Sequence, residues 1–296
     1  MKRKNKPGIA AVLAAAMAVA LTGCSGMFTD FRPFRDGTSS SEESSHTAGE
    51  STVEEALLFE REGVRITATD MEKGLLGTEL HLLVENDTEK NIGVQCDTVA
   101  VNGYMMDHIF SCTVAAGKKA NDSLTLNQDD LDAAEITAIG EIAIRFKVFD
   151  RDTYDSLFVT DEVAVRTSSY DTMEIQAADD GKELYNADGL RIVAKYVEDN
   201  TLSGTAVTMF IENKTAGDII VQCDDLSVNG FMMMPVFSSR VNKGCMAIDD
   251  LILLSSELET NNIDKVTSVE LKFKIVEADT YRTLHTSDAV QFAVGD

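Results

Sequence analysis

The sequence predicts an all-β protein made of two tandem antiparallel β-sandwiches that follow an apolar N-terminal segment and a polar stretch. Three observations support this prediction. A motif that begins at residue 94 recurs 127 residues later, and apolar and polar residues alternate with a period of two in both copies. An Asn-Gly pair also stands between apolar runs in each copy. A period of two is typical of half-buried antiparallel strands.

The first 23 residues divide into a basic patch, an apolar run from Ile9 to Leu21 and an exit of small residues. These are the three regions of a secretory signal peptide. The apolar run is shorter than the roughly 20 residues that a membrane-spanning helix needs. We therefore expect residues 1–23 to be removed.

The exit ends in Leu21-Thr22-Gly23-Cys24, which resembles the lipobox of bacterial lipoproteins at all four positions. The resemblance implies cleavage before Cys24 and a diacylglycerol, such as a palmitate-bearing one, on its sulfur. Two acyl chains anchor a protein stably where one does not. The prediction is an extracytoplasmic lipoprotein, bound to the outer face of the cell membrane through the lipid on Cys24.

Residues 24–54 are rich in Ser, Glu, Gly and Thr and poor in branched apolar residues. Such a stretch buries too little to offset the entropy of ordering, so it is predicted to be a flexible tether. Removal of residues 1–23 takes away four basic residues, which leaves 22 basic residues and an excess of acidic ones, of which there are 50. This excess repels nucleic acid and anionic lipid head groups and favours cationic partners. No nucleic-acid partner is expected.

The internal repeat decides the domain organisation. VQCDTVAVNGYMM at 94–106 recurs as VQCDDLSVNGFMM at 221–233, and the two copies align without a gap from Gly77 to Val163. Two domains are expected, at 55–168 and 183–296. Asn102-Gly103 and Asn229-Gly230 each predict a two-residue hairpin turn, because both central positions of that turn need positive φ. One short helix is expected per copy, at 128–134 after Asn127 and at 255–260 from Ser255.

About seven short strands in each copy of roughly 110 residues, with turn signals every 8 to 12 residues, favour an immunoglobulin-like sandwich. The chain has no Trp, so the Cys, Trp, Cys spacing of antibody domains is missing. The repeated VQCD and VNG(Y/F)MM pattern resembles the uncharacterised Ig-like domains that lipoproteins of Gram-positive anaerobes carry, often in tandem. That resemblance implies the fold and the location, but no activity.

Four cysteines remain after Cys24: Cys96, Cys112, Cys223 and Cys245. A two-residue turn at Asn102-Gly103 would place Cys96 opposite Ile109, with Cys112 roughly 10 Å further along. A disulfide needs Cα atoms within about 7 Å. We therefore expect reduced, buried thiols.

No residue pattern predicts catalysis. His81, His108 and His285 form no spaced motif with each other or with a cysteine, and none recurs in the other copy. A dyad of Cys96 and His81 is conceivable, but a cysteine on the buried side of a strand is a poor nucleophile. The sequence predicts neither an enzyme nor a metal or cofactor site. A cell-envelope hydrolase with an unrecognised site is the alternative.

The acidic run at 150–155 offers carboxylates at alternate positions, which would suit calcium and a calcium-dependent scaffold. The second copy replaces one acid and adds a cation, keeping only Asp-Thr-Tyr. This favours a structural turn in which the Asp of that triplet caps the backbone and the Tyr packs.

Large apolar residues follow each hairpin turn and form the candidate partner surface: Tyr104, Met105 and Met106 in the first copy, and Phe231, Met232 and Met233 in the second. Consecutive apolar residues place one side chain on each face of a strand, and Met and aromatic residues adapt well to partners. Pro235 indicates an edge strand. These clusters either pack within the chain or dock a protein or peptide, for example by strand addition. The leading prediction is a non-catalytic interaction module.

Overall fold

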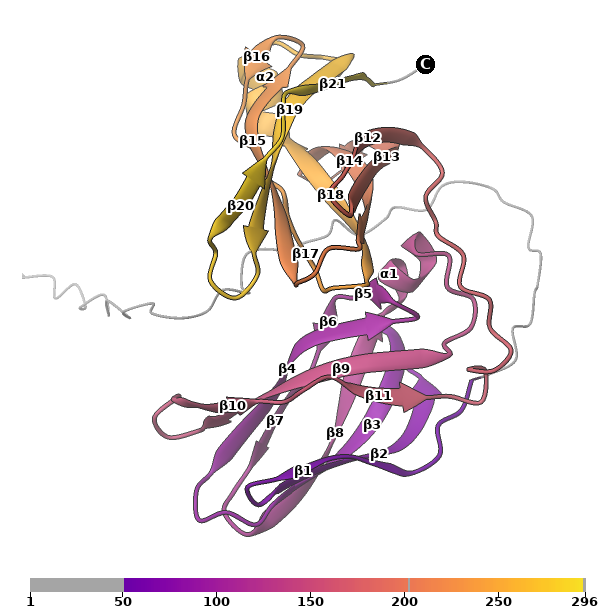
Figure 1. Ribbon diagram of the computed structural model, residues 1–296, viewed down its shortest axis with the longest axis vertical. Helices are drawn as coiled ribbons and strands as arrows, with labels where there is room; N and C mark the ends of the chain where they lie inside the picture. The colour runs from indigo at the N-terminus through magenta and orange to yellow at the C-terminus, as the bar shows by residue number, and fades with distance from the viewer. Residues whose placement is uncertain (1–50, 202, 295–296) are drawn as a thin grey trace, which may run out of the picture. The chain divides into compact units, whose positions relative to one another are not determined.

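The computed structural model describes residues 51–201 and 203–294 (Figure 1). The predicted signal peptide, the predicted lipidation site Cys24 and the predicted tether up to residue 50 lie outside the described residues. No helix in the described part of the chain is long and apolar enough to cross a membrane.

The first repeat has two facing antiparallel sheets. One has the order β1-β2-β3-β8-β6; its strands are β1 (Ala56–Arg61), β2 (Val64–Lys73), β3 (Gly77–Asn86), β8 (Lys118–Asn127) and β6 (His108–Ile109). In the other sheet β4 pairs with β5, β7 and β9, and β9 also pairs with β10 and β11. Its strands are β4 (Ile92–Val101), β5 (Tyr104–Met105), β7 (Ser111–Val114), β9 (Glu141–Asp150), β10 (Ser156–Val159) and β11 (Val163–Arg166). Helix α1 (Gln128–Ala133) follows β8.

The second repeat repeats this plan. Its first sheet has the order β12-β13-β14-β18, with β12 (Lys182–Ala187), β13 (Leu190–Thr201), β14 (Gly204–Asn213) and β18 (Met246–Leu254). Its second sheet has the order β16-β15-β19-β20, with β17 also on β15 and β21 also on β19. Those strands are β15 (Ile219–Val228), β16 (Phe231–Met232), β17 (Ser238–Val241), β19 (Ser268–Glu277), β20 (Thr283–Thr286) and β21 (Val290–Ala293), and α2 (Ser255–Thr260) follows β18. The described part of the chain is nearly all β and forms two tandem Ig-like sandwiches, as predicted.

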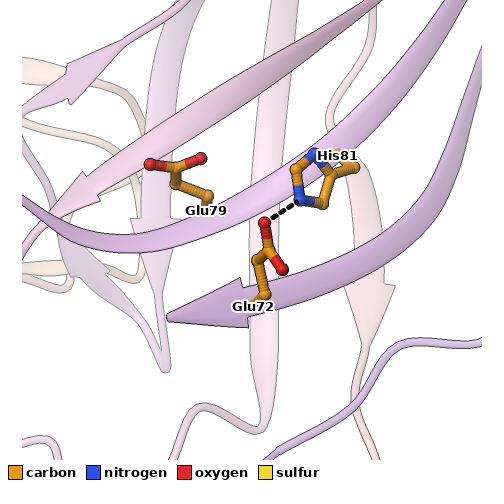
Figure 2. Close-up of side chains that lie close together, drawn as sticks. All are labelled: Glu72, Glu79 and His81. Carbon is orange, nitrogen blue, oxygen red and sulfur yellow. Dashed lines mark hydrogen bonds and ion pairs between the residues drawn. The ribbon is translucent and has the colours of Figure 1, made fainter. Parts of the chain in front are cut away.

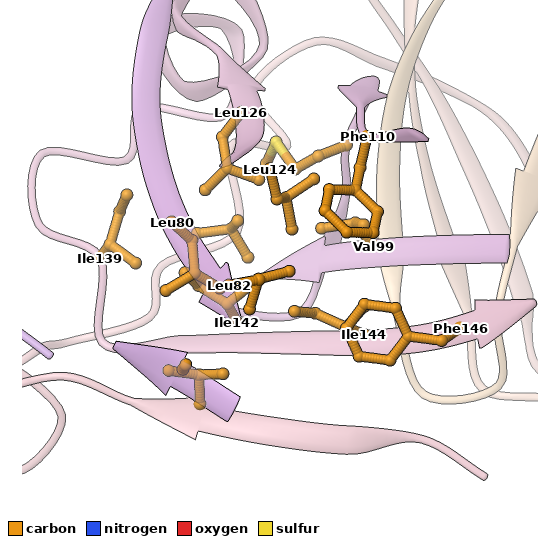
Figure 3. Packing of buried hydrophobic residues seen from close by; sticks show 14 of the residues in the cluster. Leu80, Leu82, Val99, Phe110, Leu124, Leu126, Ile139, Ile142, Ile144 and Phe146 are labelled. Atoms are coloured by element: carbon orange, nitrogen blue, oxygen red, sulfur yellow. The ribbon is translucent and has the colours of Figure 1, made fainter. Parts of the chain in front are cut away.

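The alternation seen in the sequence fills the core of each sandwich. Strand β9 is buried at every second position, and Leu80, Leu82 and Val84 of β3 are fully buried. Figure 3 shows side chains of β3, β4, β8 and β9 meeting between the two sheets of the first repeat. Burial of one face of each strand is the main force that holds such a sandwich together.

Strand β14 departs from this rule, because nearly all of its residues are buried, on both faces. Val207, Met209 and Ile211 belong to the core of the second repeat, whereas Phe210 belongs to the core cluster of the first. Val193 and Ile248, from neighbouring strands, also join that first cluster. A single parallel pair, Met246 with Tyr104, connects β18 to β5. The outer face of this sheet is therefore covered by the first repeat.

Equivalent residues of the two copies make equivalent hydrogen bonds. The amide of Asn86 donates to the carbonyls of Lys90 and Val114, and that of Asn213 donates to the carbonyls of Gly217 and Val241. Both predicted Asn-Gly turns are confirmed, with φ of 49° at both asparagines and of 84° and 86° at the glycines.

The predicted pairing of Cys96 with Ile109 is wrong. After the turn only Tyr104 and Met105 pair with β4, and β6 then crosses to β8, where Ile109 lies opposite Thr125. The chain returns as β7 in a register that places Cys112 opposite Val94. A register shift in β4 between Cys96 and Thr98 accompanies this change. The turn determines only the two residue pairs between β4 and β5. The burial of Phe110 and Cys112 then determines the register of the strands that follow.

Two further expectations need correction. The structure has eleven strands in the first repeat and ten in the described part of the second, where seven were expected in each, because returning chains break into short pieces where they change sheet. Helix α2 begins at Ser255 but its N-cap is Leu254, which makes no side-chain cap bond. Helix α1 is capped as predicted, since the Asn127 side chain accepts a hydrogen bond from the amide of Asp129.

Candidate functional site

The first tip, residues 102–106, is enclosed by the chain itself. Tyr104 is 1% exposed and its ring meets that of Phe210 edge-on, with centroids 6.4 Å apart. Its hydroxyl accepts a hydrogen bond from the amide of Ala178 at 2.7 Å and lies 3.3 Å from the carbonyl of Gln176. Burial raises the pKa of Tyr104. Met106 is buried, and half-buried Met105 packs against the core of the second repeat. These three residues are not available to a partner.

The second tip, residues 229–236, is open. Phe231 is 47% exposed, Met232 67% and Met234 59%. Beneath them Met233 is buried, and its amide donates to the carbonyl of Leu226 at 3.0 Å. The candidate surface is therefore corrected: Met233 anchors the tip, whereas Met234 and partly exposed Val236 belong to its surface. The sequence could have indicated Met234, because it belongs to the run of three methionines after Phe231. No sequence pattern indicated Val236.

The second tip is held firmly on its domain. The Met234 amide donates to the Glu257 carboxylate of α2 at 2.9 Å, and Val236 forms a bridge with Ile252 of β18. Strand β16 lies at the edge of its sheet, as Pro235 indicated, although Pro235 itself lies outside any strand. The exposed Phe and Met side chains thus project from an ordered edge.

The two tips differ in what covers them: the first packs on a receiving face of the second repeat, whereas the second is exposed. This face consists of Val193, Phe210 and Ile248, all of which are buried. At the aligned positions the first repeat has Thr67, half-buried Leu83 and exposed Asn121. Two of the three apolar residues are replaced by polar ones, so the first repeat has no equivalent face.

Polar contacts accompany the packing between the two repeats. The Arg145 guanidinium lies 3.1 Å from the Asp218 carboxylate, and the buried amide of Asn242 donates to the hydroxyl of Thr98 at 3.2 Å. A cavity of about 430 Å³ lies beside them, lined by Asp97, Arg145, Val159, Thr160, Asp161, Glu162 and Asp279. This lining holds four carboxylates and one cation. Its carboxylates could hold a cation, and the lining includes no histidine or cysteine.

All four described cysteines are free thiols. Burial raises the pKa of Cys112 and Cys245 to about 11 and that of Cys223 to about 12, and it raises the pKa of Cys96 as well. Thiols held in the protonated form are weak nucleophiles. His81 hydrogen-bonds to Glu72 and Ser123, and it is His108 whose Nε2 lies 3.4 Å from the Cys96 carbonyl. The conceivable dyad of Cys96 and His81 is therefore not formed. His285 is exposed on β20.

The acidic run at 150–155 is a turn. The side chain of Asp150, rather than the expected Asp152, accepts hydrogen bonds from the amides of Asp152 and Thr153, and Lys90 pairs with it at 2.9 Å. Tyr154 stacks on Phe149, as the packing interpretation expected, although it stays 67% exposed. Asp150 thus caps the turn, as the structural interpretation of this run expects of an Asp.

No protein-family model matches the chain, and no curated protein matches it either. Three similar solved structures are a pilin, a chaperone and a protein of unknown function. The SafA pilin of Salmonella enterica in complex with the SafB chaperone is 12% identical, covering 80% of this chain and 98% of that one at a TM-score of 0.26. The YadV chaperone is 10% identical, with coverage of 73% and 92% and a TM-score of 0.24. A protein of unknown function from Porphyromonas gingivalis W83 is 14% identical, with coverage of 73% and 89% and a TM-score of 0.20. Resemblances this distant carry no argument about function.

Proposed function

We propose that this protein is a lipid-anchored, extracytoplasmic, non-catalytic binding protein whose second tip docks onto a protein partner. One observation carries the binding part: the first tip, with nearly the same sequence, is buried against an apolar sheet face. The same motif therefore already acts as a docking element within the chain. The anchoring part rests on Leu21-Thr22-Gly23-Cys24 at the end of the apolar leader.

The chemistry of the first contact defines the partner. Its face should present a flat, apolar patch of β-sheet like Val193, Phe210 and Ile248, onto which an aromatic ring and methionines can pack. Methionine side chains adapt to such surfaces, and aromatic residues are enriched at interface centres. A basic rim would complement the acidic excess of the chain. A lipid anchor raises the local concentration of the tip at the membrane surface, so a weak contact suffices.

Site-specific crosslinking tests the binding part. A photo-crosslinking amino acid at Met232 in the full chain, expressed in intact cells, should give one predominant adduct with another protein. The control carries the crosslinker at exposed Glu259 on α2 and should not give it. Phe231→Asp in the Met232 crosslinking chain should reduce the yield at least fivefold. An adduct between two copies of the chain would show that the tip binds a second copy of this protein and not a different protein. Equal adducts at both positions would contradict the docking surface.

Cell fractionation tests the anchor. The natural chain should remain with the membrane fraction, and Cys24→Ala should lose its lipid and no longer be processed before residue 24. Mass spectrometry of the mature N-terminus reports both changes. An unmodified Cys24 in the natural chain would contradict the anchor and leave the tip proposal intact.

A further inference from the structure

Three potential metal ligands meet on the outer face of the first sheet of the first repeat, at the end of the β2–β3 hairpin. Glu72 lies on β2 directly opposite Glu79 on β3, and His81 follows two residues later, on the same face as Glu79. One ligand atom from each residue lies within 4.8 Å of the other two. Figure 2 shows Glu72 and His81 facing each other across neighbouring strands, joined by a dashed line, with the Glu79 side chain on the same strand as His81.

Among the described side chains, the imidazole of His81 is the partner of the Glu72 carboxylate. Like charges directly opposite each other on neighbouring strands are destabilising, and in the described residues no lysine or arginine forms an ion pair with Glu72 or Glu79. Glu85, further along the same face of β3, is paired with both Lys119 and Arg65. The carboxylate of Glu85 is therefore neutralised by cationic side chains, whereas Glu72 and Glu79 could be neutralised by a cation from solution.

Both ring nitrogens of His81 face oxygen atoms. Nδ1 of His81 lies 2.9 Å from the hydroxyl of Ser123, which is opposite His81 on β8, and Nε2 lies 3.1 Å from Oε1 of Glu72. Metal-ligating histidines commonly use one ring nitrogen for the ion and donate from the other to a neighbouring oxygen. A tetrahedral Zn²⁺ with bonds of about 2.0–2.1 Å has ligand atoms roughly 3.3 Å apart. The 3.1 Å separation of Nε2 from the Glu72 oxygen, which is a hydrogen bond here, is close to this value, so these two ligands would need to move little to hold an ion.

The backbone leaves space for the second carboxylate. A β-carbon at Gly74 would collide with the Glu79 side chain. The described residues of the second repeat form no such cluster, since Ala206 and Thr208 stand where the first repeat has Glu79 and His81. There the Thr208 hydroxyl donates to Asp250 at 2.6 Å. Within the described part of the chain, the cluster belongs to the first repeat.

We propose that Glu72, Glu79 and His81 form a binding site for a divalent transition-metal ion, with Zn²⁺ as its representative and water completing the coordination. One imidazole with two carboxylates suits such an ion, whereas Ca²⁺ and Mg²⁺ prefer oxygen ligands alone. The dication offsets the repulsion between the two carboxylates. Ser123 is a positioning residue, since it contacts only the far nitrogen of His81. This site is independent of the second tip, so either proposal can fail without the other.

Calorimetric titration of the full chain with Zn²⁺ tests the site. The natural chain should bind one ion at this site, at least tenfold more tightly than Ca²⁺. His81→Thr, which installs the residue of the second repeat, should weaken binding at least a hundredfold. Ser123→Ala should weaken it by about tenfold or more, as loss of such supporting contacts does. His285→Gln, which removes an exposed histidine elsewhere, should change the affinity less than twofold.

Thermal unfolding provides a second readout that does not depend on binding heat. Zn²⁺ should raise the Tm of the natural chain, whereas Glu79→Ala should raise the Tm of the metal-free chain by relieving repulsion and abolish the response to Zn²⁺. Absence of Zn²⁺ binding by the natural chain overturns the proposal. So does binding that survives His81→Thr but is lost on Cys223→Ser, because the thiols would then be the ligands.

Discussion

The two hairpin tips have nearly the same sequence but opposite surroundings. Their turns have matching φ values, and in each the asparagine side chain accepts hydrogen bonds from two backbone amides of the neighbouring chain segment. Tyr104 of the first tip is nevertheless 1% exposed, whereas Phe231 of the second is 47% exposed. The difference lies in the covering surface: Val193, Phe210 and Ile248 of the second repeat cover the first tip, whereas the second tip is exposed. A motif thus sets the shape of a tip, and the neighbouring domain sets whether it is core or surface.

Truncating the aromatic ring at each tip should produce the largest contrast. Tyr104→Ala removes a buried ring and a hydroxyl bonded to Ala178, so we expect a loss of about 3–5 kcal/mol in the free energy of unfolding. Phe231→Ala should cost less than about 1 kcal/mol, because half of that ring is already in water. Urea denaturation measures both values. Equal losses would show that the second tip is also enclosed.

The turn asparagines should give a smaller contrast. Asn102 is buried, and its side chain bonds the amides of Gly140 and Glu141 and the carbonyl of Ala138. We expect Asn102→Ala to cost about 2–3 kcal/mol, because these groups would be left unpaired away from water. Asn229→Ala should cost about 1–2 kcal/mol, since water can reach its partners. The same denaturation experiment measures both variants, and a larger loss at Asn229 would reverse the comparison.

The aligned cations Arg145 and Lys272 test the packing between the repeats. Arg145 is only partly exposed and reaches Asp218 of the second repeat, while Lys272 pairs with Asp225 inside its own repeat. We expect Arg145→Ala to cost about 1–2 kcal/mol, between the ranges for exposed and buried pairs, and Lys272→Ala to cost below about 1 kcal/mol. Raising the salt concentration should reduce the Lys272 effect more. An Arg145 effect no larger than that of Lys272 would mean that this contact does not couple the repeats.

The equivalent thiols Cys96 and Cys223 should show the smallest contrast. Burial raises the pKa of both in the folded chain, that of Cys223 to about 12. Each buried thiol therefore contributes fully to the free energy of unfolding below its unfolded pKa of about 8.5. That contribution is lost as the pH rises toward the pKa of the folded chain. The free energy of unfolding should be insensitive to these thiols near pH 7 and decrease above about pH 9. Cys96→Ala and Cys223→Ala should each make that decrease shallower. Unchanged profiles would show that neither thiol is buried in its protonated form.

Local features of the sequence determined most of the fold. The period of two located the strands, Asn102-Gly103 and Asn229-Gly230 placed both turns, and Asn127 marked the start of α1. These features succeed because a strand's faces, a turn's φ values and a helix cap depend on residues close together in the chain. The pairing of Cys96 did not follow from the turn, because the strand leaves its partner after two residues.

The sequence by itself determined two similar β-sandwiches and the apolar residues at their tips. Only the tertiary structure decided that Tyr104 is core and Phe231 is surface, because the covering residues lie about 90 to 150 positions away in another domain. The cluster of Glu72, Glu79 and His81 was likewise not evident from spacing. Its geometry depends on a register shift in the β2–β3 ladder and on Ser123 from a third strand. Strand register and domain packing join residues that are distant in sequence, and local rules do not contain that information.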